Sequence, residues 1–224
     1  MNAVEAHELY RFFHTEDEET LALRGVSLSV GQAEIVAVIG PSGSGKSTLL
    51  SCICGIDEPD GGYVLINGSR ITRKSEPQRA AIRAKSVGIV MQAKNLLNHL
   101  SVRDNIALKM WLGRQNGKKS NVNIKSLLEW VDLTERGSFY PPQLSGGEAA
   151  RAALAVALAA RPAILIADEP TGEVDRDTEM KIIQLFQKYK ADGGSAIIAT
   201  HSEALAGFAD KVIKLRDGRI PADG

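Results

Sequence analysis

The chain has 224 residues, of which 44% are hydrophobic and 24% charged, so it can bury the core of a globular domain. Its 27 basic residues balance its 27 acidic residues, which argues against a nucleic-acid-binding protein. Residues 1–14 lack the apolar segment of a secretion signal, and no run approaches the roughly 20 apolar residues of a membrane span. We therefore expect one domain, residues 1–224, that is cytoplasmic and meets a membrane only through a partner.

The first ninety residues predict strands, turns and one helix. Residues 23–30 alternate around Val26, Leu28 and Val30, as a strand with one buried face does, and the acidic run at 16–19 indicates a hairpin loop before it. Asn67-Gly68 is typical of a second hairpin turn. The expected strands are residues 23–30, 34–39, 63–66 and 87–91, with a helix at 46–54 and a partly helical segment at 74–85.

Helical patterns dominate between residues 93 and 159, which predicts a helical subdomain inserted into a core of residues 1–92 and 160–224. Ser145 opens a long alanine-rich helix, and Glu148, three residues on, has the spacing of a capping box. The expected elements are helices at residues 102–111, 124–133, 145–160 and 177–190, strands at 163–167 and 196–200, and a closing hairpin at 212–220.

Strands that are apolar throughout and alternate with helices predict an α/β fold with a parallel sheet covered on both faces. Ligands of such sheets bind beyond the carboxyl ends of the strands. In this chain a glycine-rich stretch, then Gln92, then Asp168-Glu169, then His201 each follow the end of an expected strand. The sequence therefore predicts one site at this edge of the sheet.

The glycine-rich stretch fits the pattern G-x-x-x-x-G-K-[ST], a phosphate-binding loop between a strand and a helix. Its glycines let several N–H groups point at one anion, and the helix that follows adds its positive end. Lys46 would reach the β- and γ-phosphates, and the Ser47 hydroxyl would ligate Mg²⁺. The alternative is a glycine-rich turn without a ligand, which the motifs further along the chain disfavour. The loop consists of Gly40, Pro41, Ser42, Gly43, Ser44, Gly45, Lys46, Ser47 and Thr48.

Two adjacent carboxylates, Asp168 and Glu169, end an apolar strand. One carboxylate there could be a strand terminator or a helix cap. Two in series, in a chain with a phosphate loop, indicate a division of labour. Asp168 would hold Mg²⁺, directly or through water, and Glu169 would orient and deprotonate the attacking water.

A second anion-binding helix start follows the insertion, at Leu144-Ser145-Gly146-Gly147-Glu148. A chain with one nucleotide has no obvious use for a second such site. A two-fold dimer would give this second site a use, because the segment could then cap the γ-phosphate bound by the other subunit. The alternative is a glycine hinge and helix cap that binds nothing.

In order and spacing these motifs resemble those of an ATP-binding-cassette (ABC) ATPase, over essentially the whole chain. The resemblance is specific, because the LSGG signature does not accompany phosphate loops in other families. It implies a P-loop NTPase fold with a RecA-like parallel core, an N-terminal antiparallel β region and an inserted helical subdomain. It also implies hydrolysis of ATP with Mg²⁺, a homodimer, and a separate integral membrane permease that holds the subunit at the cytoplasmic face of the inner membrane.

Three stretches, residues 87–106, 140–151 and 167–175, resemble one branch of that family. The branch contains MacB-like exporters, Lol-type lipoprotein-releasing ATPases, the FtsE cell-division ATPase and antimicrobial-peptide-resistance exporters. The resemblance implies export, or extrusion of a lipoprotein or peptide. The alternative is FtsE-like mechanical regulation of a membrane partner without transport. An ABC ATPase acting on DNA or ribosomes is disfavoured, because that class generally needs long coiled coils or two cassettes.

The resemblance implies roles for individual residues. Gln92 would sense Mg²⁺ and the γ-phosphate and relay to the permease, and His201 would contact the γ-phosphate. The implied catalytic residues are therefore Glu169, His201 and Gln92. The implied metal ligands are Ser47, Gln92 and Asp168.

Further roles follow from the same resemblance. The signature at 145–148 would contact ATP across the dimer, and Asp175 would lie at the dimer seam. Phe13 would stack on adenine, although Tyr10 and Phe12 lie close by in the sequence. The stretch from about residue 92 to 105 would face the permease.

The chain also departs from the family pattern, at Ala149-Ala150, Val156 and Glu173-Val174. None of these positions removes a catalytic group, so we expect an active enzyme.

Overall fold

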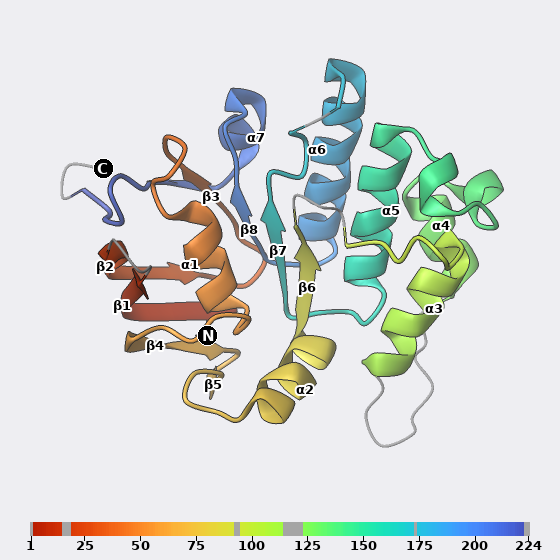
Figure 1. The fold of residues 1–224 in the computed structure, drawn as a ribbon. Coiled ribbons are helices and arrows are strands. Elements are labelled where there is room, and N and C mark those ends of the chain that lie inside the picture. Colours follow the sequence, from red (N-terminus) through yellow and green to blue (C-terminus); the bar gives the residue numbers. More distant parts are fainter. Residues whose placement is uncertain (1, 15–18, 92–94, 114–122, 173, 222–224) are drawn as a thin grey trace.

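The computed structural model describes residues 2–14, 19–91, 95–113, 123–172 and 174–221, and within them two sheets and their covering helices form the fold (Figure 1). The larger sheet has five strands in the order β6-β7-β8-β3-β9, and every pairing in it is parallel. Its strands are β3 (Ile35–Ile39), β6 (Val87–Val90), β7 (Ile164–Asp168), β8 (Ala196–Ala199) and β9 (Lys211–Lys214).

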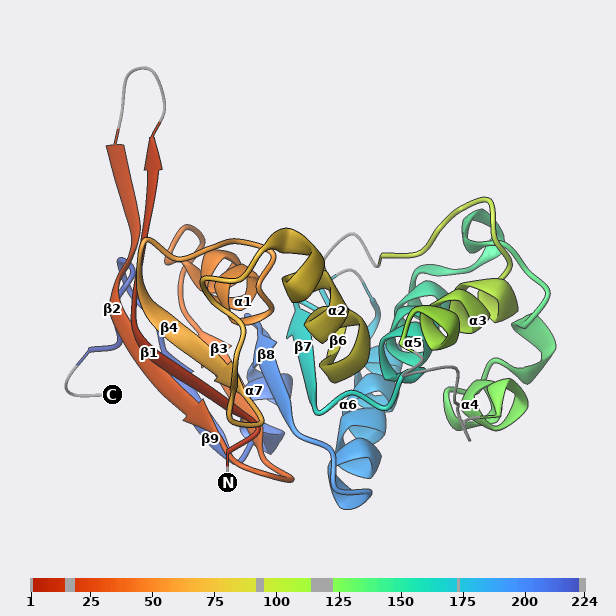
Figure 2. The same ribbon diagram turned by 90° about the horizontal axis from the view of Figure 1, so that it is seen from below.

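The smaller sheet is antiparallel, in the order β2-β1-β4-β5. Its first two strands form a long hairpin that projects beyond the body of the molecule (Figure 2). Glu19, expected in the hairpin loop, begins β2, and the rest of that acidic run lies outside the described residues. The strands are β1 (Val4–His14), β2 (Glu19–Val30), β4 (Gly61–Ile66) and β5 (Ser69–Arg70).

The helices lie close to the ranges that periodicity predicts. Ser145 is the N-cap of α5: its hydroxyl accepts a hydrogen bond from the Glu148 amide at 3.2 Å, which confirms the capping box. No helix in the described ranges combines the length and apolarity that a membrane crossing requires. The helices are α1 (Lys46–Ile53), α2 (Glu76–Ser86), α3 (Val102–Leu112), α4 (Ile124–Trp130), α5 (Gly146–Leu158), α6 (Arg176–Ala191) and α7 (Glu203–Phe208), with 3₁₀ turns at Thr134–Arg136 and Pro141–Gln143.

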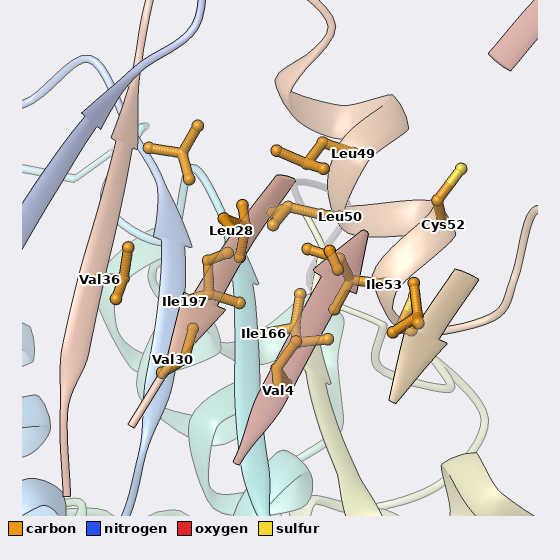
Figure 3. Close-up of a cluster of buried hydrophobic side chains, with 14 of the residues drawn as sticks. Val4, Leu28, Val30, Val36, Leu49, Leu50, Cys52, Ile53, Ile166 and Ile197 are labelled. Carbon is orange, nitrogen blue, oxygen red and sulfur yellow. The ribbon is translucent and has the colours of Figure 1, made fainter. Parts of the chain in front are cut away.

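Both faces of the parallel sheet are covered, as the sequence predicts. On one face Ile166 and Ile197 pack with Leu50 and Ile53 of α1 and with the inner face of the antiparallel sheet (Figure 3). On the opposite face α5, α6 and α7 cover the strands, and Phe186 of α6 is fully buried there (Figure 2). Because β3, β7 and β8 contact apolar side chains on both faces, they read as nearly continuous apolar runs, whereas the edge strand β9 buries only Ile213.

The alanines of α5 face two ways. Ala153 and Ala157 pack with the parallel sheet, whereas Ala152 and Ala155 pack with α3 and α4 in a separate apolar cluster. Val156, one of the departures from the family pattern, packs against that second cluster. The alanine-rich composition therefore lets one helix lie between two cores at close range.

The prediction of a closing hairpin at 212–220 is wrong for its first arm. β9 pairs with β3 in parallel, and the chain then closes only a single bridge between Arg216 and Arg219. The apolar pair Val212 and Ile213 fits an edge strand of a parallel sheet as well as a hairpin arm, and β9 gains burial of Ile213 by joining β3. Helix α7 was not among the expected elements.

Asn105 of α3 holds the segment of residues 97–101 by hydrogen bonds. Its buried side chain accepts a hydrogen bond from the Leu97 amide at 2.8 Å and donates to the carbonyls of Leu97, Leu100 and Ser101 at 3.2, 3.0 and 2.9 Å. We expect Asn105→Ala to lower the free energy of unfolding by about 1–3 kcal/mol, since it leaves buried polar groups without partners. Urea unfolding measures this change, with the exposed Arg103→Ala on the same helix as control. Equal stability of the two variants would contradict the prediction.

Candidate active site

A cavity of about 530 Å³ lies where the carboxyl ends of β3, β7 and β8 meet the end of the β1–β2 hairpin. It brings together most of the site residues that the sequence predicts. Gly40 and Pro41 form the entry to the loop but do not line the cavity. The lining residues are Phe13, Thr20, Leu21, Ala22, Arg24, Ser42, Gly43, Ser44, Gly45, Lys46, Ser47, Thr48, Asp168, Glu169, His201, Asp217 and Gly218.

The phosphate loop has the backbone geometry of an anion cradle. Gly43 and Gly45 have φ of +76° and +100°, which L side chains rarely adopt. A Cβ on Gly45 would lie 2.6 Å from the Ala22 carbonyl oxygen, whereas a Cβ on Gly43 would meet nothing within 4 Å. Helix α1 begins at Lys46 without a side-chain cap, so its first N–H groups lack the partner that a serine or aspartate would supply. An anion fits this position.

Lys46 is buried and already points at the loop. Its Nζ donates to the carbonyl oxygens of Gly40 at 2.8 Å and Pro41 at 3.2 Å, and lies 3.4 Å from Nε2 of His201. The hydroxyl of Ser44 is buried without a partner among the described residues. A buried hydroxyl without a partner, in a loop that also carries Lys46, is an environment that a phosphate oxygen would complete.

The two carboxylates at the end of β7 lie differently. Asp168 ends the strand with 4% of its surface exposed, and Glu169 follows with φ +49°, the left-handed region. Glu169 Oε2 accepts a hydrogen bond from the His201 amide at 3.2 Å, and its Oε1 lies 3.2 Å from His201 Nε2. A non-glycine residue in this region costs about 1–3 kcal/mol, and eight other non-glycine residues of the described ranges also adopt it. In this conformation the Glu169 carboxylate lies against His201.

A residue that the sequence analysis missed supports this arrangement. Glu179 of α6 accepts hydrogen bonds from the hydroxyls of Ser202 at 2.5 Å and Thr171 at 3.3 Å. It thereby ties the segment after β8, which carries His201, to the segment after β7, which carries Glu169. No local pattern around Glu179 distinguishes it from an ordinary helix carboxylate.

Phe13 is the one of the three neighbouring aromatic residues that lines the cavity. Its side chain is partly exposed, and the guanidinium of Arg11 lies 4.8 Å from its ring centroid. Tyr10 instead lies against Gly25 and Gly61. Of these three aromatic residues, Phe13 is therefore the one whose ring an aromatic base in the cavity could contact.

The signature segment lies away from the cavity. None of residues 145–148 lines it, and the Glu148 carboxylate is occupied by the Ser145 amide at 2.9 Å and the Arg136 guanidinium at 2.8 Å. These hydrogen bonds hold the pKa of the Glu148 carboxyl below its ordinary value. Within one chain, this carboxylate therefore stabilises the start of α5.

Asp175 and the signature meet through Thr178. Asp175 caps α6 by accepting from the Thr178 amide at 2.9 Å and hydroxyl at 2.8 Å, which lower the pKa of its carboxyl. A Cβ on Gly147 would lie 2.6 Å from the Thr178 Cγ2, so the two helix starts are in contact. Gln92 and Glu173 lie outside the described residues.

Comparison with known proteins decides the family. The model of a family described as ABC transporter matches residues 23–172, two thirds of the chain. The chain belongs to the ABC transporter family. It is an ATP-binding subunit of that family, an ABC ATPase, and its fold and its motifs agree with this assignment.

Individual relatives of this ABC ATPase match over nearly their whole length. The lipoprotein-releasing system ATP-binding protein LolD of Bordetella pertussis is 39% identical, over 99% of this chain and 96% of its own. LolD 2 of Caulobacter vibrioides is 40% identical, over 95% of this chain and 93% of its own. A dimeric structure of the ABC transporter cassette MJ0796 is 33% identical, with a TM-score of 0.89 over 97% of this chain and 96% of that one. The same cassette in a post-hydrolysis state bound to ADP and Pi has a TM-score of 0.88.

The donor set of the ABC ATPase cavity suits Mg²⁺ as well as nucleotide. Ser47 supplies a hydroxyl and Asp168 a buried carboxylate, both oxygen ligands, and both residues line the cavity. Mg²⁺ prefers one or two such protein oxygens together with substrate phosphates and water. The residues present therefore fit this ion.

Replacing Lys46 tests the phosphate cradle. Lys46→Ala removes a charge-assisted hydrogen bond, and such a bond contributes about 1.5–3 kcal/mol, so we expect ATP affinity to fall about ten- to hundredfold. Isothermal titration calorimetry measures the change, and the exposed Lys85→Ala, far along α2, serves as control. Unchanged affinity in Lys46→Ala would remove this lysine from the phosphate site.

Proposed function

We propose that two copies of this ABC ATPase bind two ATP molecules, close on them, and drive a separate membrane permease that exports or extrudes a lipoprotein or peptide. The observation that carries the dimer is the position of the signature. Residues 145–148 start a helix with two glycines, and none of them lines the cavity of their own chain. We propose that residues 145–148 contact the γ-phosphate of the ATP that the second subunit binds. The dimeric structure of MJ0796 and the LolD relatives support it.

Hydrolysis divides among residues of both subunits. The phosphate loop and Lys46 hold the phosphates, Phe13 stacks on adenine, and the partner's signature closes the site. The Glu169 carboxylate takes a proton from the attacking water while the water oxygen bonds to the γ-phosphorus. The bond between the γ-phosphorus and the bridging oxygen breaks, and ADP leaves. His201, 3.2 Å from Glu169, then contacts the γ-phosphate oxygens. Ser47, Gln92 and Asp168 would hold Mg²⁺, which would neutralise phosphate charge.

The output of the cycle is closure and reopening. ATP joins the two subunits because each nucleotide contacts both, and loss of the γ-phosphate removes those contacts. Asp175, in contact with the signature through Thr178, would lie at the seam. The permease would hold the dimer at the cytoplasmic face of the inner membrane and receive the motion near residues 92–105.

Purification of the subunit from its native membrane tests the permease. We expect a stable complex with an integral membrane protein whose helices surround a substrate path. A small partner that instead recruits a hydrolase would replace transport with FtsE-like mechanical regulation. Recovery of the subunit with no membrane protein would contradict both outputs.

Glu169→Gln tests the proposed base. The amide keeps the shape of the carboxylate but cannot take a proton, so we expect ATP hydrolysis to fall about 10²- to 10⁴-fold. ATP binding should persist, and a closed dimer should accumulate on size-exclusion chromatography. The exposed Glu203→Gln in α7 controls for loss of charge nearby. Turnover near the wild-type rate in Glu169→Gln would exclude Glu169 as the base.

Ser145→Arg tests the composite site. The added bulk and length should block closure, so hydrolysis should be lost while single subunits still bind ATP with unchanged affinity. The substitution also removes an N-cap worth about 1 kcal/mol, and Ser145→Asp separates the two effects because aspartate caps but repels a phosphate. Ser126→Arg, on an exposed turn of α4, is the control. If both Ser145 variants hydrolyse ATP normally, the signature does not act across a dimer.

A further inference from the structure

The short turn after β9 has a form that few residues allow. Arg216 and Arg219 exchange both main-chain hydrogen bonds at 2.9 Å, which closes a two-residue turn. Asp217 and Gly218 between them have φ of +49° and +72°. Positive φ at both central positions defines a type I′ turn, for which Asp-Gly is a favoured pair.

This turn is bonded to the phosphate loop. The Gly218 amide donates to the Ser44 carbonyl at 3.0 Å, and the Gly218 carbonyl accepts from the Arg24 amide at 2.8 Å. Just before the turn, the Leu215 amide donates to the Ile39 carbonyl at 2.7 Å. The N–H and C=O groups of a single residue, Gly218, therefore link the phosphate loop to β2.

The backbones approach too closely for side chains to intervene. A Cβ on Gly218 would lie 2.6 Å from the Ala22 carbonyl oxygen, as would a Cβ on Gly45 of the loop. A Cβ on Gly40 would lie 2.1 Å from the Leu215 carbonyl oxygen. Three segments, distant in sequence, thus meet main chain to main chain around the phosphate loop, and Asp217 and Gly218 line the same cavity.

We propose that the turn at Arg216–Arg219 is a positioning element of the nucleotide site. The turn holds the phosphate loop in its binding conformation through the main-chain hydrogen bonds of Gly218. A loop ordered before binding loses less entropy when the phosphates arrive, so the turn raises nucleotide affinity. The effect passes through the backbone, because the side chains of Arg216 and Asp217 are 77% and 82% exposed. The sequence predicts Asp217-Gly218 only as the turn within a closing hairpin.

Gly218→Ala tests the proposal, with ADP as the ligand. ADP binding to single subunits depends neither on dimer closure nor on a permease, so the result is separate from the fate of the proposed transport cycle. The added Cβ would push the turn away from Ala22, and we expect the Kd for ADP to rise about tenfold or more. Gly193→Ala is the matched control: its φ is +88°, with nothing within 4 Å of the added Cβ, and it lies outside the cavity. It carries similar backbone strain, and its Kd should stay within twofold of wild type.

Two further measurements separate positioning from general instability. Asp217→Val strains the turn without adding an atom at Gly218, and Asp217→Asn tolerates positive φ, so the Kd should rise more in the valine variant than in the asparagine variant. In the wild-type protein, ADP should slow hydrogen exchange of the Gly218 and Arg24 amides but not of the Gly193 amide. The proposal is overturned if folded Gly218→Ala binds ADP like wild type, if the Asp217 variants are equal, or, should Gly218→Ala not fold, if ADP leaves the Gly218 amide exchange unchanged.

Discussion

Burial of the parallel sheet on both faces determines where the chemistry of this ABC ATPase can lie. Ile166 and Ile197 point into one apolar cluster, and Leu165 and Ile198 into the other, so the middle of the central strands β7 and β8 offers no position for a polar side chain. The polar groups of the site collect where the strands end. Asp168 ends β7 and Glu169 follows it, the phosphate loop follows β3, and His201 follows β8 by two residues. The site is thus a consequence of the core.

The same edge brings charged side chains together. The Nζ of Lys46 donates hydrogen bonds to two loop carbonyls, and the Glu169 carboxylate lies 3.2 Å from the His201 ring. Both Lys46 and His201 line the cavity, and the Nζ of Lys46 lies 3.4 Å from the Nε2 of His201. Glu179 joins the segments that follow β7 and β8 through hydrogen bonds from two hydroxyls. The groups that face the cavity are thus held by hydrogen bonds within the chain.

Sequence reasoning located the residues whose position depends on their neighbours along the chain. The phosphate loop, the Ser145–Glu148 capping box and the carboxylates after β7 each occupy one short segment, and the structure places them as their local patterns predict. It failed where the role depends on distant segments. β9 was read as a hairpin arm because its pairing with β3 spans more than 170 residues. Asp217, Gly218 and Glu179 have ordinary neighbours, and only the fold brings them to the phosphate loop and to His201.

The alanines of α5 have a mechanical consequence. Helices usually interlock through ridges of large side chains, and moving one past another requires those ridges to unpack. Alanine projects a single methyl group, so a helix that presents alanines to both neighbours has shallow ridges on two sides. Small sliding of packed helices is one of the ways in which domains shift. Helix α5 lies between two apolar clusters and meets few large side-chain ridges on either side, so it can slide with little repacking. Its N-terminal end carries Ser145 and the rest of the signature.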